Sequence, residues 1–466
     1  MRKLAVAVAA LATAVLAGCG VLAPKPPPPQ AGIPERWPVP ESTLAPDGDV
    51  SVSDVGWRDF FVDDQLETLV ASALASNRDL RVAMLNVERT RQLYRIQRAE
   101  RVPSVDGNVT LARTGGELLP VTNDVIATVG VTGFELDLFG RVHNLSQAAL
   151  ARYFAQEAAR RAAQLTLIAE LANAYLTLSA DRELQRVAQN ALVNREQALA
   201  LTVKRHELGA VSALDVSQAQ TAVEIARTDV ARYGGLIAQD INALRLLVGA
   251  PLDPALLPAG FDLAVSGIGA LPPGLPSEVL LRRPDVQQAE QLLRAASANI
   301  GAARAAFFPS ISLTGNLGYA SEELSDVFSD GTEIWAFTPR LNLPIFQGGR
   351  LRANLGVANA ERDIALAQYE RAIQNGFREV ADALALTVSF AEQKAAQEAL
   401  VAAATRAEEL SRARYEGGRD SYLVLLDSQR TLYQAQQSLI ATQLAEQVNR
   451  VALYKVLGGG WHEETR

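Results

Sequence analysis

Two stretches of the sequence, RHELGAVSAL at residues 205–214 and RYEGGRDSYL at residues 414–423, decide the fold because the second repeats the first 209 positions later. Both follow the pattern R-x-E-x-G-x-x-S-x-L. The Gly can reverse the chain at a helix end, and the Ser can cap the helix that follows. Each stretch is therefore predicted to be the turn of a helical hairpin, present in two copies.

The repetition extends along most of the chain. Four further pairs of segments match at offsets of 206 to 209 residues. They are NRDL (77–80) with RPDV (283–286), VPSV (102–105) with FPSI (308–311), LFGR (138–141) with IFQGGR (345–350), and VG (248–249) with LG (457–458). Because this period exceeds that of solenoid repeats, we predict a duplicated domain. The predicted parts are a first repeat at 46–250, an inter-repeat linker at 251–283, a second repeat at 284–460 and a C-terminal tail at 461–466.

Proline placement predicts two long helices. All 21 prolines lie outside residues 121–250 and 345–466, where proline would break helical hydrogen bonding. Residues 142–208 and 351–416 contain no strong helix breaker. Each is expected to be a helix of about 67 residues, or about 100 Å at 1.5 Å per residue. Helices of this length must pack along one another, as in a coiled coil or a helical tube.

Four segments alternate apolar and polar residues with the period of a β-strand. They are residues 105–111, 125–132, 311–319 and 335–343. Strands with one apolar and one polar face suit a transmembrane β-barrel, although a soluble sandwich would have the same pattern. Pro339 is expected to weaken the fourth strand. Four strands are too few to close a barrel, so several chains must contribute, and three would supply about twelve strands.

The first residues form a targeting signal. Two basic residues precede an apolar stretch at 4–16, and LAGC follows at 16–19. This tetrapeptide resembles the bacterial lipobox, which implies cleavage after residue 18 and acylation of Cys19, the only cysteine. The alternative is an ordinary signal peptide with an incidental cysteine. Residues 19–45 then form a proline-rich, lipid-anchored tether, and Gly20 implies sorting to the outer membrane.

Composition disfavours several other classes of function. The net charge of −8 argues against nucleic-acid binding, which needs clustered basic residues. One cysteine and three scattered histidines offer neither a zinc site nor a Cys/His nucleophile. The sequence also has no Gly-rich phosphate loop and no nucleophile elbow. We therefore expect a protein that is not an enzyme and needs no cofactor or metal.

Together these features resemble the TolC-like outer membrane efflux protein family, and within it the OprM-like lipoprotein branch. The resemblance covers nearly the whole mature chain, including LRRPDV at 281–286 and YKVLGGGW at 454–461. It implies a mixed α/β membrane protein, a homotrimer with a 12-stranded β-barrel, four strands per chain, continued by a long periplasmic α-helical barrel. It also implies a lipid-anchored, membrane-spanning location in the outer membrane.

The implied function is passive export of drugs or other small solutes. The implied partners are a periplasmic adaptor (membrane fusion) protein, an inner-membrane RND-type transporter and outer membrane lipid. Two alternatives remain open: a duct of the same fold for type I protein secretion, and a lipid-anchored helical scaffold that conducts nothing.

The resemblance also implies roles for residues at the hairpin turns. Leu423 and Asp427 would form the pore constriction, and Asp215 and Tyr415 would be gate latch residues, while Asp420 replaces a basic latch partner of some relatives. The tips that contact the adaptor would be Gly209, Ala210, Val211, Ser212, Gly418, Arg419, Asp420 and Ser421. Plain hairpin turns and a solvated helix carboxylate at Asp427 are the alternative interpretations.

The lipobox assignment predicts the outcome of replacing Cys19 with Ser. Because the thiol is the acylated group, Cys19→Ser should abolish incorporation of radioactive fatty acid during metabolic labelling, while the parent chain is labelled. Persistent labelling of the variant would contradict the assignment.

Overall fold

The computed structural model describes residues 22–38, 52–261 and 276–465, so the signal peptide and Cys19 lie outside the described residues. The chain divides into two compact units. The first contains residues up to Ala31 together with Leu85–Ala159 and Gln287–Ala372. The second contains Gly32–Met84, Arg160–Val286 and the chain from Ile373 onward.

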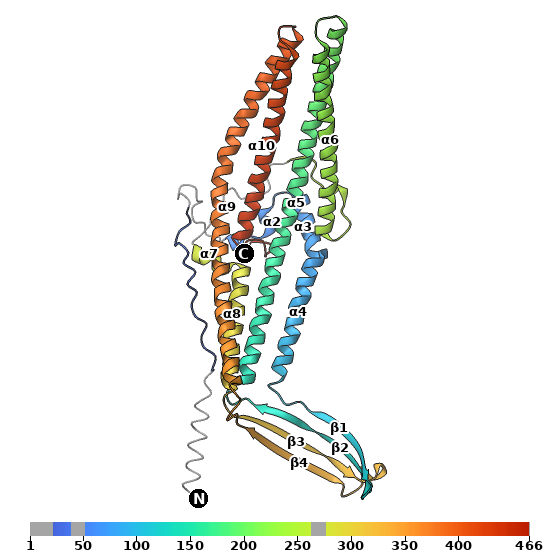
Figure 1. Ribbon diagram of the computed structural model, residues 1–466, viewed down its shortest axis with the longest axis vertical. Helices are drawn as coiled ribbons and strands as arrows, with labels where there is room; N and C mark the ends of the chain where they lie inside the picture. Colours follow the sequence, from blue (N-terminus) through green and yellow to red (C-terminus); the bar gives the residue numbers. More distant parts are fainter. Residues whose placement is uncertain (1–21, 39–51, 262–275, 466) are drawn as a thin grey trace. The chain divides into compact units, whose positions relative to one another are not determined.

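The first unit contains one four-stranded antiparallel sheet in the order β1-β2-β3-β4 (Figure 1). Its strands are Asp106–Gly116, Leu119–Leu136, Ser310–Ser321 and Glu333–Asn342. The four predicted strands are therefore present. β4 runs through Pro339, which lies opposite Leu313, and in the described part of the chain β4 has one neighbouring strand. An edge strand tolerates a proline because half of its ladder groups have no partner within the sheet.

One face of the sheet exposes large apolar side chains. Val129, Leu317 and Trp335 lie opposite one another in the register of β2, β3 and β4, so their side chains share a face. They are 53%, 69% and 81% exposed. Among the described residues no second layer covers these three side chains, which disfavours the soluble sandwich.

The two longest helices are α5, Arg141–Glu207, and α9, Arg350–Glu416, and each has 67 residues as predicted. In the second unit, α6 (Ala213–Val248) returns beside α5, and α10 (Tyr422–Val456) returns beside α9 (Figure 1). The prediction of two helical hairpins is confirmed. Among the described residues, no helix is both long enough and apolar enough to cross a membrane.

Shorter elements complete the described chain. These are η2 (Val52–Asp54), α2 (Trp57–Phe60), α3 (Asp64–Ser76), α4 (Arg78–Ala99), η3 (Pro254–Leu256), α7 (Pro276–Arg282), α8 (Pro284–Ala305) and η4 (Leu324–Asp326). In the first unit, α8 packs closely on α5, because a Cβ at Gly301 would lie 2.7 Å from the Asn144 side chain.

The apolar core of the second unit gathers around α2 and α3. Phe60 stacks on Tyr454 with ring centroids 3.8 Å apart, and the Tyr454 hydroxyl donates to the Val55 carbonyl at 2.7 Å. The chain after α10 also joins this core, since the Trp57 amide donates to the His462 carbonyl. Burial raises the pKa of Tyr454, which keeps this hydroxyl a neutral donor.

Equivalent joints hold the ends of α6 and α10. Asn77, between α3 and α4, donates from Nδ2 to the Leu247 carbonyl at 2.8 Å. Arg283, between α7 and α8, donates from Nη1 to the Val456 carbonyl at 3.0 Å. Both side chains are buried. The last carbonyls of a helix have no partner inside the helix, so these bonds satisfy groups that the helices themselves leave unpaired.

The charged Arg283 side chain pairs with two carboxylates at this joint. Its Nη2 lies 2.8 Å from an Asp285 oxygen and 2.7 Å from a Glu379 oxygen on α9. Burial disfavours the charged guanidinium, but the hydrogen bonds and charges of these two carboxylates outweigh it and raise the pKa of Arg283. The arginine of the LRRPDV motif thus connects α7, α8, α9 and the end of α10.

Replacing Arg283 with Met should destabilise the protein strongly. The variant leaves the Val456 carbonyl without its donor and removes the partner of two carboxylates that are 43% and 39% exposed. Leaving a buried polar group unsatisfied costs about 1–3 kcal/mol. Thermal unfolding of the detergent-solubilised protein measures the loss.

Arg282→Met is the matched control, because Arg282 pairs with Asp54 at 3.3 Å while half exposed, and exposed ion pairs contribute about 0–1 kcal/mol. Equal melting temperatures for the two variants would contradict the assigned role of Arg283.

Candidate functional site: the hairpin tips and the face beside them

The two hairpin turns have the same backbone structure. Gly209 and Gly418 have φ of 74° and 69°, a region that favours glycine. The Ala210 amide donates to the Arg205 carbonyl and the Arg419 amide to the Arg414 carbonyl, at 2.8 and 2.9 Å. This six-to-one bond and left-handed glycine define a Schellman helix end. The repeated Gly of the sequence pattern is therefore explained by the turn geometry.

Different side-chain hydrogen bonds stabilise the two turns. Ser212 and Asp215 form a capping box at the start of α6, in which the Ser212 amide donates to Asp215 Oδ2 at 2.9 Å. Ser421 precedes α10 without a side-chain cap bond. Instead, Arg414 donates to both oxygens of Asp420, at 2.6 and 2.8 Å, and this bond lowers the pKa of Asp420.

Six of the eight predicted adaptor-contacting residues are exposed. These are Gly209, Ala210, Ser212, Gly418, Arg419 and Ser421. Val211 and Asp420 are half-buried. The exposed residues of this set offer backbone and small or polar side chains, and Leu208 beside them is 84% exposed.

A small apolar cluster closes the tips below the turns. Tyr415 and Tyr422 are each 1% exposed, and their rings meet edge to face with centroids 5.8 Å apart. Leu425, Ala198 and Ala219 complete the cluster, so α5, α6, α9 and α10 all contribute. Burial raises the pKa of Tyr422 to about 12.

Tyr415 and Asp215, the two predicted latch residues, do not bond to each other in the chain. The Tyr415 hydroxyl lies 2.7 Å from Thr202 Oγ1 on α5, and the Arg205 guanidinium lies over the Tyr415 ring. Asp215 bonds to Ser212. Tyr415 therefore links the two hairpins through Thr202, which the sequence reasoning did not identify.

Further links between the hairpins were also absent from the sequence predictions. The Tyr433 hydroxyl donates to Asp229 at 2.9 Å, and the Gln437 amide donates to the Tyr233 hydroxyl at 3.0 Å. Each bond joins residues 204 apart in the chain. No motif marks such pairs, because a tyrosine on a helix carries no local signal of its partner.

Leu423 and Asp427, the predicted constriction residues, share one exposed face of α10. Leu423 is 58% exposed, and Asp427 makes no ion pair with the described residues. The opposite face of α10 is buried through Tyr422 and Leu425. The tip cluster therefore holds α10 in an orientation that leaves one leucine and one carboxylate uncovered in a single chain.

The described residues contain no group of three or more His, Cys, Asp or Glu side chains that could hold a metal. The site instead combines two exposed turns, a closing cluster and an uncovered helix face.

Comparison with known proteins agrees with this geometry. A family model described as "Outer membrane efflux protein" matches residues 69–250 and 275–459. The chain is 45% identical to a probable efflux pump outer membrane protein, TtgC of Pseudomonas putida, over 97% of the chain and 94% of that protein. It is 41% identical to the outer membrane protein OprJ of Pseudomonas aeruginosa, over 99% and 98%.

A solved structure has the same fold. The open state of the MtrE outer membrane channel of Neisseria gonorrhoeae matches with a TM-score of 0.88 and 38% identity, over 95% of this chain and 99% of that one. Matches of this extent, with the family model covering both hairpins, establish that the chain belongs to the outer membrane efflux protein family.

Proposed function

We propose that three copies of this chain form a passive export channel in the outer membrane, serving a tripartite efflux pump. The supporting observation is the four-stranded sheet, whose β1 and β4 edges have no partner among the described residues and whose apolar face is exposed. Open sheet edges are not tolerated in hydrocarbon, so the sheet must close with other copies. Three sheets would give a barrel of about 12 strands, continued by the long helices as a tube.

The transported molecules are proposed to be drugs or other small solutes. A relative from Pseudomonas putida at 45% identity is named a toluene efflux pump outer membrane protein. An inner-membrane RND-type transporter would supply energy, and a periplasmic adaptor would connect it to the channel. The exposed residues of the two Schellman turns are the proposed adaptor contact, since glycine and small side chains allow a helical partner to approach closely.

The remaining assignments keep the predicted boundaries. Residues 1–18 are the proposed signal peptide and 19–45 the tether anchored through Cys19, followed by repeats at 46–250 and 284–460, a linker at 251–283 and a tail at 461–466.

Leu423 and Asp427 are the proposed constriction. In a trimer, their exposed face on α10 would bring three leucines and three carboxylates together at the axis. The leucines would discourage water, and the carboxylates would attract cations and repel one another. The Tyr415 bond to Thr202 is the proposed latch, because it must break if the two hairpins separate.

The proposed trimer predicts the mass of the assembled protein. Native mass spectrometry of the detergent-solubilised protein should give three mature chains, because one sheet cannot close alone. A stable monomer would contradict the proposal.

The constriction predicts altered conductance. The double variant Leu423→Ala/Asp427→Ala should raise the resting single-channel conductance in a planar bilayer several-fold and lower its cation selectivity. Cells carrying it should also become sensitive to vancomycin.

The control removes the same types of side chain from α9, as Leu410→Ala/Glu409→Ala, where both residues are exposed. Unchanged conductance of the α10 variant would place the constriction elsewhere. A parent protein without any conductance would favour a scaffold, and loss of protein export on gene deletion would favour a secretion duct.

A further inference from the structure

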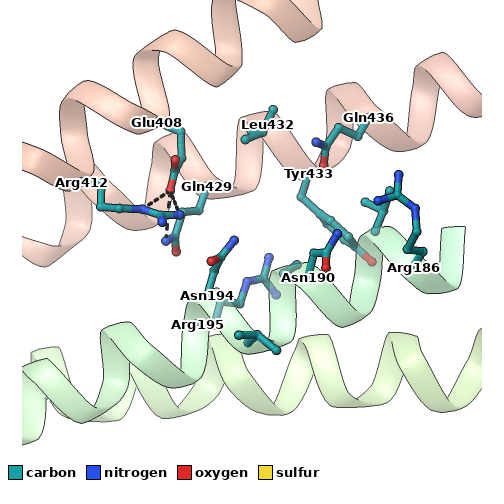
Figure 2. A pocket seen from close by; sticks show the side chains of 13 residues that line it. Arg186, Asn190, Asn194, Arg195, Glu408, Arg412, Gln429, Leu432, Tyr433 and Gln436 are labelled. Atoms are coloured by element: carbon teal, nitrogen blue, oxygen red, sulfur yellow. Dashed lines mark hydrogen bonds and ion pairs between the residues drawn. The ribbon is translucent and has the colours of Figure 1, made fainter. Parts of the chain in front are cut away.

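A cleft between the two hairpins of the second unit has no role in the proposed channel function. It has a volume of about 400 Å³ and lies between α5 on one side and α9 and α10 on the other (Figure 2). Its lining is mainly polar, with arginine, asparagine and glutamine side chains directed into the space between the helices. The volume suits a small molecule.

Arg195 of α5 is a buried charge of this cleft without a carboxylate partner among the described residues. The residue is only 4% exposed, and its hydrogen bond within the described chain runs from Nη1 to the Ala222 carbonyl at 3.0 Å. Its guanidinium also lies 5.3 Å from the centroid of the Tyr433 ring. No described carboxylate forms an ion pair with it. Burial lowers the pKa of Arg195, because little in the protein compensates the lost hydration of the charge.

The carboxylates near Arg195 already accept hydrogen bonds from other residues. Glu408 accepts from Arg412 at 2.7 Å, and Asp229 accepts from Tyr433 at 2.9 Å and from Arg232 at 3.0 Å. Arg186 also lines the cleft and pairs with Glu183. The charged residues that line the cleft are three arginines and one glutamate, so the lining has an excess of positive charge.

Gln429 of α10 adds a second unsatisfied group. It is 9% exposed, and its Oε1 has no hydrogen-bond partner, while its Nε2 makes a 3.5 Å contact with Glu408. A buried acceptor without a donor costs free energy. The cleft therefore has spare donors at Arg195 and a spare acceptor at Gln429, on opposite hairpins.

We propose that this cleft binds a small organic oxyanion, a carboxylate or phosphate group on a molecule that also carries a hydroxyl or amine donor. The oxyanion would accept from the fork of Arg195, a geometry that arginine offers to carboxylates and phosphates. The donor would satisfy Gln429 Oε1. The ligand would thus connect α5 to α10 and hold the two hairpins together.

Calorimetry on the full detergent-solubilised assembly tests the proposal. The probes are citrate, which carries a hydroxyl besides its carboxylates, inorganic phosphate, and chloride at matched ionic strength. Citrate or phosphate should bind and raise the melting temperature, and chloride should not. Comparing the affinities for citrate and for phosphate identifies which oxyanion the cleft prefers.

Arg195→Gln should weaken that binding at least about tenfold, since it removes the charged donor. Arg406→Gln is the matched control, because Arg406 is an exposed arginine of α9 outside the cleft lining, and it should bind like the parent. Equal binding by the two variants would overturn the proposal, as would no binding of citrate or phosphate by the parent.

If Arg195→Gln fails to assemble, a second variant tests the proposed oxyanion binding. Asn194→Asp keeps the side-chain shape and adds a fixed negative charge to the cleft lining. It should abolish oxyanion binding while the protein still assembles, and undiminished binding would overturn the proposal. Because the readout is ligand binding, its failure would leave the proposed channel function unaffected.

Discussion

The buried ends of the two returning helices are the constraint on which the second unit depends. The last carbonyls of α6 and α10 have no acceptor role left inside their own helices, and those of Leu247 and Val456 lie in partly buried surroundings. At equivalent places in the two halves of the chain, Asn77 and Arg283 supply the missing donors from the break between two shorter helices. Each long hairpin is thereby fixed at its base, while its turn lies at the far end of the same two helices.

The strongly periodic parts of the fold could be predicted from the sequence, because their causes are local. Absence of proline predicted both 67-residue helices, and the repeated glycines predicted Gly209 and Gly418 as the turns. The role of Arg283 could not be predicted. The sequence identified Arg283 only as part of the LRRPDV motif. Its ion-pair partner Glu379 lies 96 residues away, and no sequence pattern connects the two.

The predicted latch shows how a local interaction competes with a distant one. Asp215 lies three residues after Ser212, so one of its carboxylate oxygens, Oδ2, accepts the capping-box bonds of the same turn. Tyr415 has no such local partner and reaches across to Thr202. Within one chain, the local partner of Asp215 and the distant partner of Tyr415 thus place the two predicted latch residues in separate contacts.

The contacts between the hairpins differ in kind from those at their bases. The bases share a continuous apolar core around Trp57, Phe60 and Tyr454, whose exposure to water would be costly. Towards the tips, the hairpins share a few polar bonds, including those of Tyr415 and Tyr433, and a small apolar cluster. A polar bond that opens to water is replaced by bonds to water, so its net loss is only about 1 kcal/mol. Separation of the hairpins is therefore cheapest near the tips, where Leu423 and Asp427 lie, and an oxyanion at Arg195 would raise the cost of that movement without altering the core.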